Sequence, residues 1–537
     1  MPTSPAARHP RLALILLCLL LWLPGLWSLP PGDRDESRFV QATKQMLETG
    51  DWVRIRNGEE DRNRKPIGIY WLQLPFAAAA HAAGIATVNP VWPYRLPSLL
   101  GALAAVLAVF ETGCVLFDRR QALLAGVLLA PCVILAVEAH IAKTDAALAG
   151  SVAVAMAVLA RAWMQPARVG RGTAATFWLA MGVGVLLKGP IGPMVVGLAV
   201  LVLSLWERRW AWLRALRPGW GVPLMLAVVL PWFVAIGTAT QGRFFADAVG
   251  GDLGRKLASG DDSHWGPPGL HLLLLPLLAF PATLPVLAAL PAAWRTRRDP
   301  ALRFLLAWVV PSWLVFEAAP TKLPHYTLPL YPALMLLAAW WLTMPRPAGR
   351  WWPHAARALT VLSGFLLAAG AVAVPVVLHG PWWLGVPGLL AAGLVTWFAV
   401  QATPQGAVRA TLAAVPLYAA LLWLLLPGLD ALWISPRAVA ALAAPGMPAG
   451  RFGAVGFHEP SLRFLGGTDA AFLATAQDGA AALASRQVVA VLVSDRDRAA
   501  FAAAAAGLGL PVHLAGSVSG FNYSRGRWVT LDVVDRP

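Results

Sequence analysis

The sequence predicts a polytopic α-helical membrane protein that ends in a small α/β domain. Hydrophobic residues make up 58% of the chain and charged residues only 13%, whereas about a quarter of the residues of a soluble domain are charged. Apolar runs of the length of a membrane span recur along most of the chain, and strand-like runs gather near its C-terminal end. An ordinary soluble domain is therefore excluded.

The apolar runs predict thirteen spans, because a helix of about 20 apolar residues crosses a bilayer. No small-residue cleavage site follows the first run, so we expect it to stay as a span rather than act as a signal peptide. The three cysteines lie inside apolar runs and predict small buried side chains rather than disulfides. The predicted spans are 12–29, 96–117, 122–138, 144–160, 174–187, 189–205, 220–239, 268–290, 301–318, 326–343, 355–378, 381–401 and 410–428.

The distribution of arginine predicts the orientation of these spans. With the N-terminus on the cytoplasmic side, every short inner connection carries arginine, and no short outer connection carries more than a single lysine. This asymmetry accounts for much of the net charge of +16 without a nucleic-acid partner. The segments 30–95 and 240–267, and everything after about residue 429, then lie on the outer side.

A change of composition near Gly446 predicts two domains. The strand-like runs RFGAVGF, QVVAVLV and RWVTLDV alternate there with helical runs. We therefore expect a membrane domain at 1–429 and an outer α/β domain at 446–537. The chain contains no internal repeat, which counts against transporters built from inverted repeats.

The charged stretch from Asp33 to Trp71 is the first candidate for a site. Eight of the 43 basic and eight of the 27 acidic residues of the chain lie between Leu29 and Pro66. Asp33, Asp35 and Glu36 precede an amphipathic stretch that predicts a helix from Ser37 to Thr49. One or two carboxylates suffice to cap such a helix, so we expect Asp35 to orient or deprotonate an acceptor while nearby cations hold a phosphate leaving group.

Lysine gives a second set of candidates, because only six of the 43 basic residues are lysines and all six fall on the predicted outer side. A lysine at the end of a span serves as a point charge for a ligand or extends to the interface. Asp145, at the start of the predicted fourth span, either caps that helix or faces into the bundle as a functional carboxylate. The lysine candidates are Lys65, Lys188 and Lys322, and Tyr326 would share a helix face with Lys322.

The segment 240–267 contains acidic residues and a histidine but predicts no metal site. The spacing of Asp252, Asp261, Asp262 and His264 matches no known set of metal ligands. A solvated polar loop is the better interpretation, so no cofactor is predicted, and a divalent metal is not supported by ligand spacing.

Seven segments stand out, in order along nearly the whole chain: DRDESRFVQATKQMLETGDWV (33–53), RKPIGIYWLQ (64–73), YRLPSLLGA (94–102), AKTDAAL (142–148), LLKGPIG (186–192), TKLPHYTLPLYPAL (321–334) and GFNYSRGRWVTL (520–531). Together they resemble the ArnT-like, protein-mannosyltransferase-related membrane glycosyltransferases (glycosyltransferase family 39). The resemblance implies the GT-C fold, with thirteen spans and a periplasmic C-terminal domain, in the bacterial inner membrane.

The resemblance implies transfer of a sugar from a polyprenyl-phosphate donor to lipid A or another envelope glycan at the periplasmic face. The sequence leaves the role of Asp35 open, because a phosphate acceptor needs no base and a hydroxyl acceptor does. A metal site at this position would need a carboxylate immediately before Lys65, and the chain has Arg64 there. The implied catalytic residues are Asp35, Glu36 and Asp145, and the implied phosphate-binding residues are Arg38, Lys65, Lys188, Lys322 and Tyr326.

Two other functions compete with a glycosyltransferase. A transporter or flippase of a lipid-linked envelope precursor would bind the same donor without turnover, and it would carry charges on both faces of its pathway. The candidate charges lie mainly at the outer end, which favours the enzyme. An envelope-assembly partner is the third alternative, and it rests only on the C-terminal domain.

Overall fold

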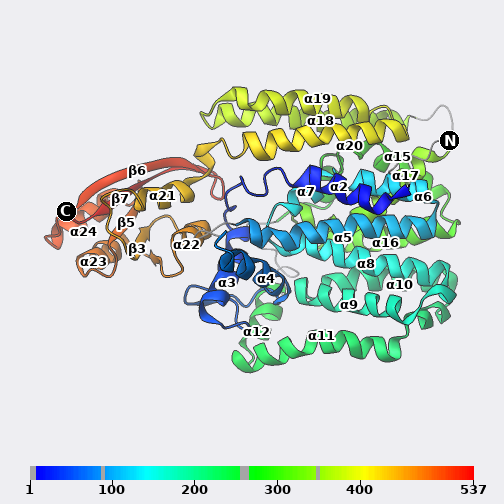
Figure 1. Cartoon of the computed structure of the whole chain (residues 1–537), viewed down its shortest axis with the longest axis horizontal. Coiled ribbons are helices and arrows are strands. Elements are labelled where there is room, and N and C mark those ends of the chain that lie inside the picture. The colour runs from blue at the N-terminus through cyan, green and yellow to red at the C-terminus, as the bar shows by residue number, and fades with distance from the viewer. Residues whose placement is uncertain (1–7, 86–90, 254–264, 346–350) are drawn as a thin grey trace.

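The computed structural model describes residues 8–85, 91–253, 265–345 and 351–537. The chain forms a bundle of long helices that lie side by side, with a smaller domain of strands and short helices projecting from one end (Figure 1). The first described helix, α2, begins toward the end of the bundle opposite this domain, and the chain that follows it runs to the domain's side.

Each of the thirteen predicted spans overlaps a helix or a pair of helices. Seven described helices are long and apolar enough to cross a membrane, or eight if α6 and α7, which are bent by 64°, form one span. The chain is therefore a multi-span membrane protein, and the count of thirteen stays a prediction. The bundle helices are α2 (Pro10–Trp22), α5 (Trp92–Leu116), α6 (Arg119–Leu129), α7 (Val133–Ala139), α8 (Thr144–Met164), α9 (Arg171–Lys188), α10 (Ile191–Glu207), α11 (Pro218–Ala239), α14 (Leu270–Leu278), α15 (Thr283–Arg295), α16 (Pro300–Ala318), α17 (Tyr331–Thr343), α18 (Trp352–Val377), α19 (Val386–Ala399) and α20 (Pro404–Tyr418).

Short helical segments join or extend these helices. The most important of them for the site is η4, a 3₁₀ segment that leads into α17. The short segments are η1 (Pro166–Arg168), η2 (Ala211–Leu216), α12 (Arg243–Phe245), η3 (Ala246–Leu253), η4 (Pro324–Leu330), η5 (Trp382–Gly385), η6 (Ala419–Leu425) and η7 (Asp430–Leu432).

Two glycines allow α5 and α8 to cross in close contact. A methyl group added at Gly150 would overlap the carbonyl oxygen of Gly101, and small residues at such crossings let two helix backbones approach each other in a membrane. Near the crossing, Ser98 Oγ donates to Lys143 O at 3.0 Å. The start of α8 therefore lies against the first turns of α5.

The charged first loop folds into two helices and a short hairpin. Helix α3 (Asp35–Thr49) ends at Gly50, whose φ of +70° favours glycine, as the sequence predicts. The strands β1 (Arg56–Asn57) and β2 (Glu60–Asp61) pair antiparallel. Helix α4 (Gly68–Ala82) follows and packs on α3, where Thr43 Oγ1 donates to Gln73 Oε1 at 2.6 Å.

The C-terminal domain is a five-stranded mixed sheet with helices, which confirms the predicted α/β class. The strands lie in the order β4-β3-β5-β7-β6, with β3 parallel to β4 and β5, and β7 antiparallel to β5 and β6. Helix α21 packs on the sheet through Ile434 and Ala438 although it precedes residue 446; the predicted domain boundaries stay predictions. The elements are α21 (Ile434–Leu442), β3 (Phe452–Val455), α22 (Pro460–Gly466), β4 (Ala471–Leu473), α23 (Ala476–Ala484), β5 (Ala490–Ser494), α24 (Arg498–Gly507), β6 (His513–Asn522) and β7 (Arg527–Asp535).

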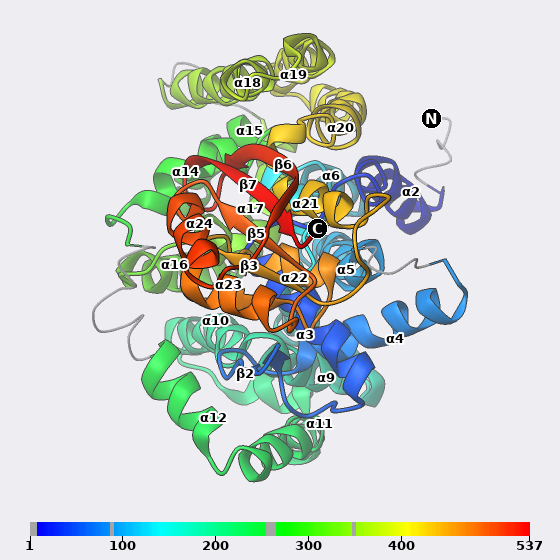
Figure 2. The same ribbon diagram turned by 90° about the vertical axis from the view of Figure 1, so that its left-hand side faces the viewer.

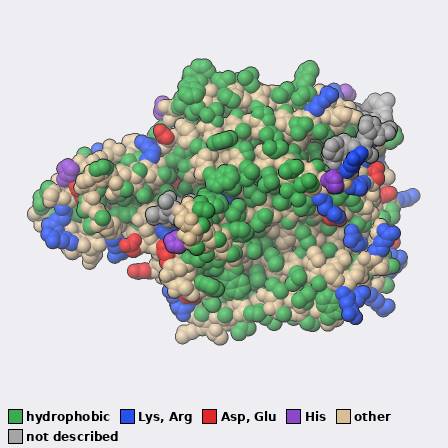
Figure 3. Space-filling view, viewed as in Figure 1, with side chains coloured by type: hydrophobic (Ala, Val, Ile, Leu, Met, Phe, Trp, Pro, Cys, Tyr) green, Lys and Arg blue, Asp and Glu red, His purple; other side chains and the backbone are tan. Residues whose placement is uncertain are grey.

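The surface of the bundle has an apolar middle and a basic end. Hydrophobic side chains cover the visible flank, and Lys and Arg gather at the end opposite the C-terminal domain (Figure 3). Trp397 in α19 is 68% exposed and Phe365 in α18 is 64% exposed. Apolar side chains this exposed on long helices are expected to face lipid.

Candidate active site

Glu36 lies buried at the start of α3 with both carboxylate oxygens occupied. Arg95 donates from Nε to Oε1 at 2.8 Å and from Nη2 to Oε2 at 2.9 Å, and the backbone N–H groups of Ala142 and Gly32 donate at 2.8 Å and 2.7 Å. Arg95 also donates to the carbonyls of Leu26, Leu29 and Pro30. This geometry favours a positioning role for Glu36 over the substrate contact that its catalytic assignment requires.

Asp35 has the opposite environment, although it is the next residue along the chain. Its side chain is 55% exposed, and its Oδ1 lies 3.9 Å from Arg38 Nη1. The preceding residue, Arg34, has a φ of +62°, which residues other than glycine rarely adopt. This sharp turn at the start of α3 lets Glu36 point inward while the Asp35 carboxylate stays accessible.

Asp35 pairs with Arg38, and three further arginines of the first loop act on Arg38. Burial and the charge of Arg62 lower the pKa of Arg38, and Arg64 and Arg34 act in the same direction. The Arg62 guanidinium lies 4.5 Å from the ring centre of Phe39, which holds it beside α3. Positive charges gathered this way repel one another and attract an anion. We call Asp35, Arg34, Arg38, Arg62 and Arg64 the open patch.

A second charged group lies buried where α7, α8, α9 and η4 meet. Lys143 Nζ is 2.9 Å from Glu138 Oε1 and 3.7 Å from Asp145 Oδ2. Lys188 forms a close ion pair with the other oxygen of Asp145, and each carboxylate also lies 3.7 Å from a ring nitrogen of His325. We call Glu138, Lys143, Asp145, Lys188 and His325 the buried cluster.

The open patch and the buried cluster are electrostatic neighbours. The negative charge of Asp35 acts on both Lys143 and His325. Tyr326 adjoins the cluster, because Lys188 Nζ lies 4.9 Å from its ring centre. The structure therefore groups three predicted residues, Asp145, Lys188 and Tyr326, around Lys143 and His325, the two basic groups on which Asp35 acts.

Two predicted lysines have other surroundings. Lys322 is buried, and its Nζ donates to Gly266 O at 2.9 Å and to Ala319 O at 2.6 Å. It therefore joins the end of α16 to the segment before α14, which favours a structural role over phosphate binding. Lys65 is half-buried in the turn after Arg64 that leads into α4.

Four residues of the site were not predicted from the sequence: Arg95, Glu138, Lys143 and His325. Arg95 and Glu138 stand inside or beside apolar runs, and an ionisable residue in such a run is a functional candidate. That signal was present for both of them. The pairing of His325 with carboxylates from α7 and α8 depends on the fold and has no local signal.

The described residues contain no group of three or more His, Cys, Asp or Glu side chains placed to hold a metal ion. Of the candidates in the segment 240–267, Asp261, Asp262 and His264 lie outside the described residues, and only the backbone of Asp252 is described.

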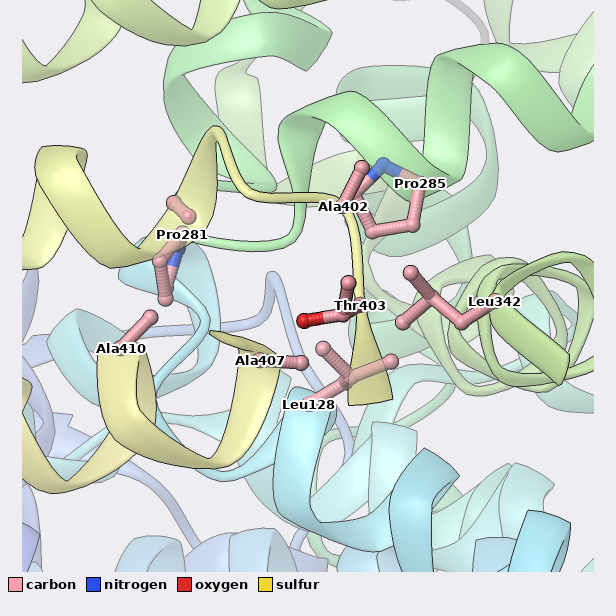
Figure 4. Close-up of a pocket in the computed structure, with 9 residues that line it drawn as sticks. Leu128, Pro281, Pro285, Leu342, Ala402, Thr403, Ala407 and Ala410 are labelled. Carbon is pink, nitrogen blue, oxygen red and sulfur yellow. The ribbon is translucent and has the colours of Figure 1, made fainter. Parts of the chain in front are cut away.

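Two cavities lie away from both charged groups. One of about 440 Å³ is lined by residues that include Arg295, Trp352 and Arg357. Figure 4 shows the other, an apolar cavity of about 10 Å³ between Leu128, Leu342 and neighbouring residues. A volume of this size holds about one water molecule.

Comparisons with known proteins identify the fold. The model of the dolichyl-phosphate-mannose-protein mannosyltransferase family matches residues 12–243. The crystal structure of ArnT from Cupriavidus metallidurans bound to undecaprenyl phosphate superposes with a TM-score of 0.77, at 22% identity, over 98% of both chains. The chain has the fold of ArnT. The resemblance to ArnT-like, protein-mannosyltransferase-related proteins of the GT-C fold is therefore confirmed.

The sequence relatives of this ArnT-like chain match part of its length. One is the undecaprenyl phosphate-alpha-4-amino-4-deoxy-L-arabinose arabinosyl transferase 2 of Pseudomonas fluorescens (strain Pf0-1), which is 30% identical over 61% of this chain and 58% of that protein. The corresponding transferase of Pectobacterium carotovorum is 28% identical over 67% of this chain and 62% of that protein. The chain thus spans about three fifths of the length of the curated relatives it matches.

Proposed function

We propose that this protein is a glycosyltransferase, hexosyl or pentosyl, that moves a sugar from a polyprenyl-phosphate donor to lipid A or a related envelope glycan. The observation that carries the proposal is the exposed Asp35 carboxylate, which pairs with Arg38 in a group of arginines and acts electrostatically on the buried Lys143 ammonium group. The names of the relatives and the undecaprenyl phosphate bound to the ArnT structure support this donor class.

The chemistry of the transfer suits these charges. The bond between the anomeric carbon and the donor phosphate breaks, the phosphate leaves with the electron pair, and a new bond forms from the acceptor oxygen to the anomeric carbon. Positive charge develops on the sugar and negative charge on the leaving phosphate. Each preorganised donor to such a phosphate contributes on the order of 3 kcal/mol.

We assign the proposed roles according to exposure. Asp35 faces the acceptor: it takes the proton of a hydroxyl acceptor, whereas with a phosphate acceptor it positions that group or stabilises the sugar cation. Arg38 and Lys65 bind the donor phosphate, and Lys188, Tyr326 and Asp145 form the inner wall. Glu36 and Lys322 hold the backbone around the site.

We place the site and the C-terminal domain on the periplasmic side of the bacterial inner membrane, with the N-terminus in the cytoplasm. The support is the concentration of Lys and Arg at the end of the bundle opposite the C-terminal domain (Figure 3), because cytoplasmic loops carry an excess of these residues.

The test compares variants at Asp35 and Lys65 with a matched control in the same loop. Asp35→Asn and Lys65→Ala are each expected to lower transfer from a purified polyprenyl-phosphate sugar by about 10²-fold or more. The control Glu59→Gln changes an exposed carboxylate of the same loop and is expected to keep wild-type activity. Full activity in both Asp35→Asn and Lys65→Ala would contradict the proposal.

The same assay separates the enzyme from a transporter or flippase. A transporter would bind the labelled donor and release it unchanged, so no glycosylated product would form with any acceptor. Mass spectrometry of lipid A from cells with and without the protein then identifies the sugar and the acceptor. A mass difference of one sugar residue is expected if lipid A is the acceptor.

A further inference from the structure

The turn that follows β6 contacts the residue two positions before Asp35. Asp33 N donates to the hydroxyl oxygen of Tyr523 at 2.6 Å. Tyr523 belongs to the segment GFNYSRGRWVTL (520–531), whose role the proposed chemistry leaves unexplained. Its neighbour Asn522 is buried and donates from Nδ2 to Glu459 Oε1 at 2.9 Å, which fixes this turn to the start of α22.

The side chain of Asp33 is held by the same domain. Ser461, in the first turn of α22, donates from Oγ to Asp33 Oδ1 in a close hydrogen bond, and Ser461 Oγ lies 2.6 Å from Ser435 Oγ of α21. Both serines are buried. The backbone and side chain of Asp33 are therefore fixed by two elements of the C-terminal domain, the turn after β6 and α22, and α21 supports Ser461.

The rest of α22 lies along α3, which both ribbon views show (Figures 1 and 2). Lys44 Nζ donates to Phe464 O at 3.2 Å, and Gln41 Nε2 donates to Thr468 Oγ1 at 2.8 Å. The Phe464 ring is fully buried and meets Tyr94 of α5 edge-on, with 5.7 Å between ring centres. The domain thus docks on the first loop through an apolar contact flanked by hydrogen bonds.

Asp35 therefore lies between two fixed neighbours. Asp33 is held by the C-terminal domain, and Glu36 is held by Arg95 of the bundle. Between them, Arg34 keeps its φ of +62°. A backbone conformation of this kind persists only where the surrounding structure fixes it from several sides.

We propose that the C-terminal domain is a positioning element for the reaction: Tyr523 and Ser461 hold Asp33 so that the turn at Arg34 presents Asp35 to the substrates. This inference rests on the proposed function. A reacting group held in its working geometry accelerates the chemical step without changing substrate affinity. Tyr523 and Ser461 act through Asp33 and are positioning residues.

The kinetic test uses Tyr523→Phe, Ser461→Ala and the double variant in the full chain. The double variant is expected to lose about tenfold in kcat, with the KM for the polyprenyl-phosphate sugar unchanged, because a lost hydrogen bond of this type is equivalent to a factor of about 10. The control is Ser519→Ala, since the hydroxyl of Ser519 on β6 pairs across the hairpin with that of Thr530. Wild-type kcat in the double variant, alongside an inactive Asp35→Asn, would overturn the inference.

A second measurement does not depend on activity. Hydrogen exchange of a peptide covering residues 30–40 is expected to quicken in the double variant and to stay at the wild-type rate in Ser519→Ala. Tyr523→Phe removes one oxygen from a side chain that is 39% exposed, so it serves if Ser461→Ala fails to fold. Unchanged exchange in a folded Tyr523→Phe would overturn the inference, whereas absence of transfer by the wild type would contradict only the proposed function.

Discussion

The open patch and the buried cluster use the same kinds of residue for different purposes. In the buried cluster, two carboxylates face two ammonium groups and an imidazole, and every side chain is at most 14% exposed. In the open patch, the half-exposed Asp35 carboxylate pairs with Arg38, and the charges of the other three arginines act on Arg38. The cluster is balanced within the protein, whereas the patch has an excess of positive charge that an anionic ligand would neutralise.

This difference indicates which mutations affect stability and which affect function. Removal of one member of a buried ion pair costs about 3–5 kcal/mol, because the other charge is left without a partner. Exposed ion pairs contribute about 0–1 kcal/mol. Mutations in the patch should therefore reduce transfer while the protein stays folded, and mutations of buried pairs should reduce both.

The largest expected effect on stability is at the buried pair that adjoins Asp35. Arg95→Met leaves the Glu36 carboxylate buried at 4% exposure without its guanidinium partner, and we expect a loss of about 3–5 kcal/mol in the free energy of unfolding. Chemical unfolding in detergent measures this loss. Asp35→Asn, one residue from Glu36, serves as the comparison and should change it by less than about 1 kcal/mol.

Asp145→Asn tests the buried cluster. The substitution removes the carboxylate that Lys188 and Lys143 share and leaves Glu138 beside Lys143, and we expect a loss of about 3 kcal/mol in stability. Transfer should also fall, since the cluster adjoins Tyr326 and Asp35. Unfolding and transfer are measured on the same preparation, and a fully stable, inactive variant would instead assign Asp145 to direct contact with substrate.

Arg38→Gln tests the open patch and should have a smaller effect. Loss of one partly exposed guanidinium should lower kcat/KM for the polyprenyl-phosphate donor by about tenfold, a smaller loss than for a preorganised donor, and leave stability unchanged. The matched control is Arg56→Gln, because Arg56 pairs with Asp61 at 3.2 Å across the β1–β2 hairpin. Equal losses of kcat/KM in the two variants would show that donor binding depends only on the net charge of the loop and not on the position of Arg38.

The sequence predicted local structure well and long-range pairing poorly. The end of α3 at Gly50 and the strands of the C-terminal domain follow from turn chemistry and periodicity, which nearby residues determine. The pairing of Glu36 with Arg95, 59 residues away, depends on how α3 packs against α5. For the same reason the carbonyl partners of Lys322 had no signal in the sequence, although Asp145 at the edge of a span did.

Asp33 gives the smallest effect, a dependence of domain docking on pH. Burial raises the pKa of Asp33 from 3.8 to about 7, Ser461 and Arg34 oppose the rise, and Glu459 adds to it. Since the pKa is higher in the folded state, the stabilising contribution is fully present below about pH 4 and is lost as pH rises through about 7.

The comparison for this last prediction is between the wild type and Asp33→Asn. The wild type should lose thermal stability between about pH 4 and pH 7 relative to Asp33→Asn, whose neutral amide does not titrate. Tyr523 also faces Asp33, but its own pKa is raised by burial and by Asp33, so it stays protonated over this range. Parallel curves of thermal stability against pH for the two proteins would show that Asp33 is solvated rather than held between α22 and the turn after β6.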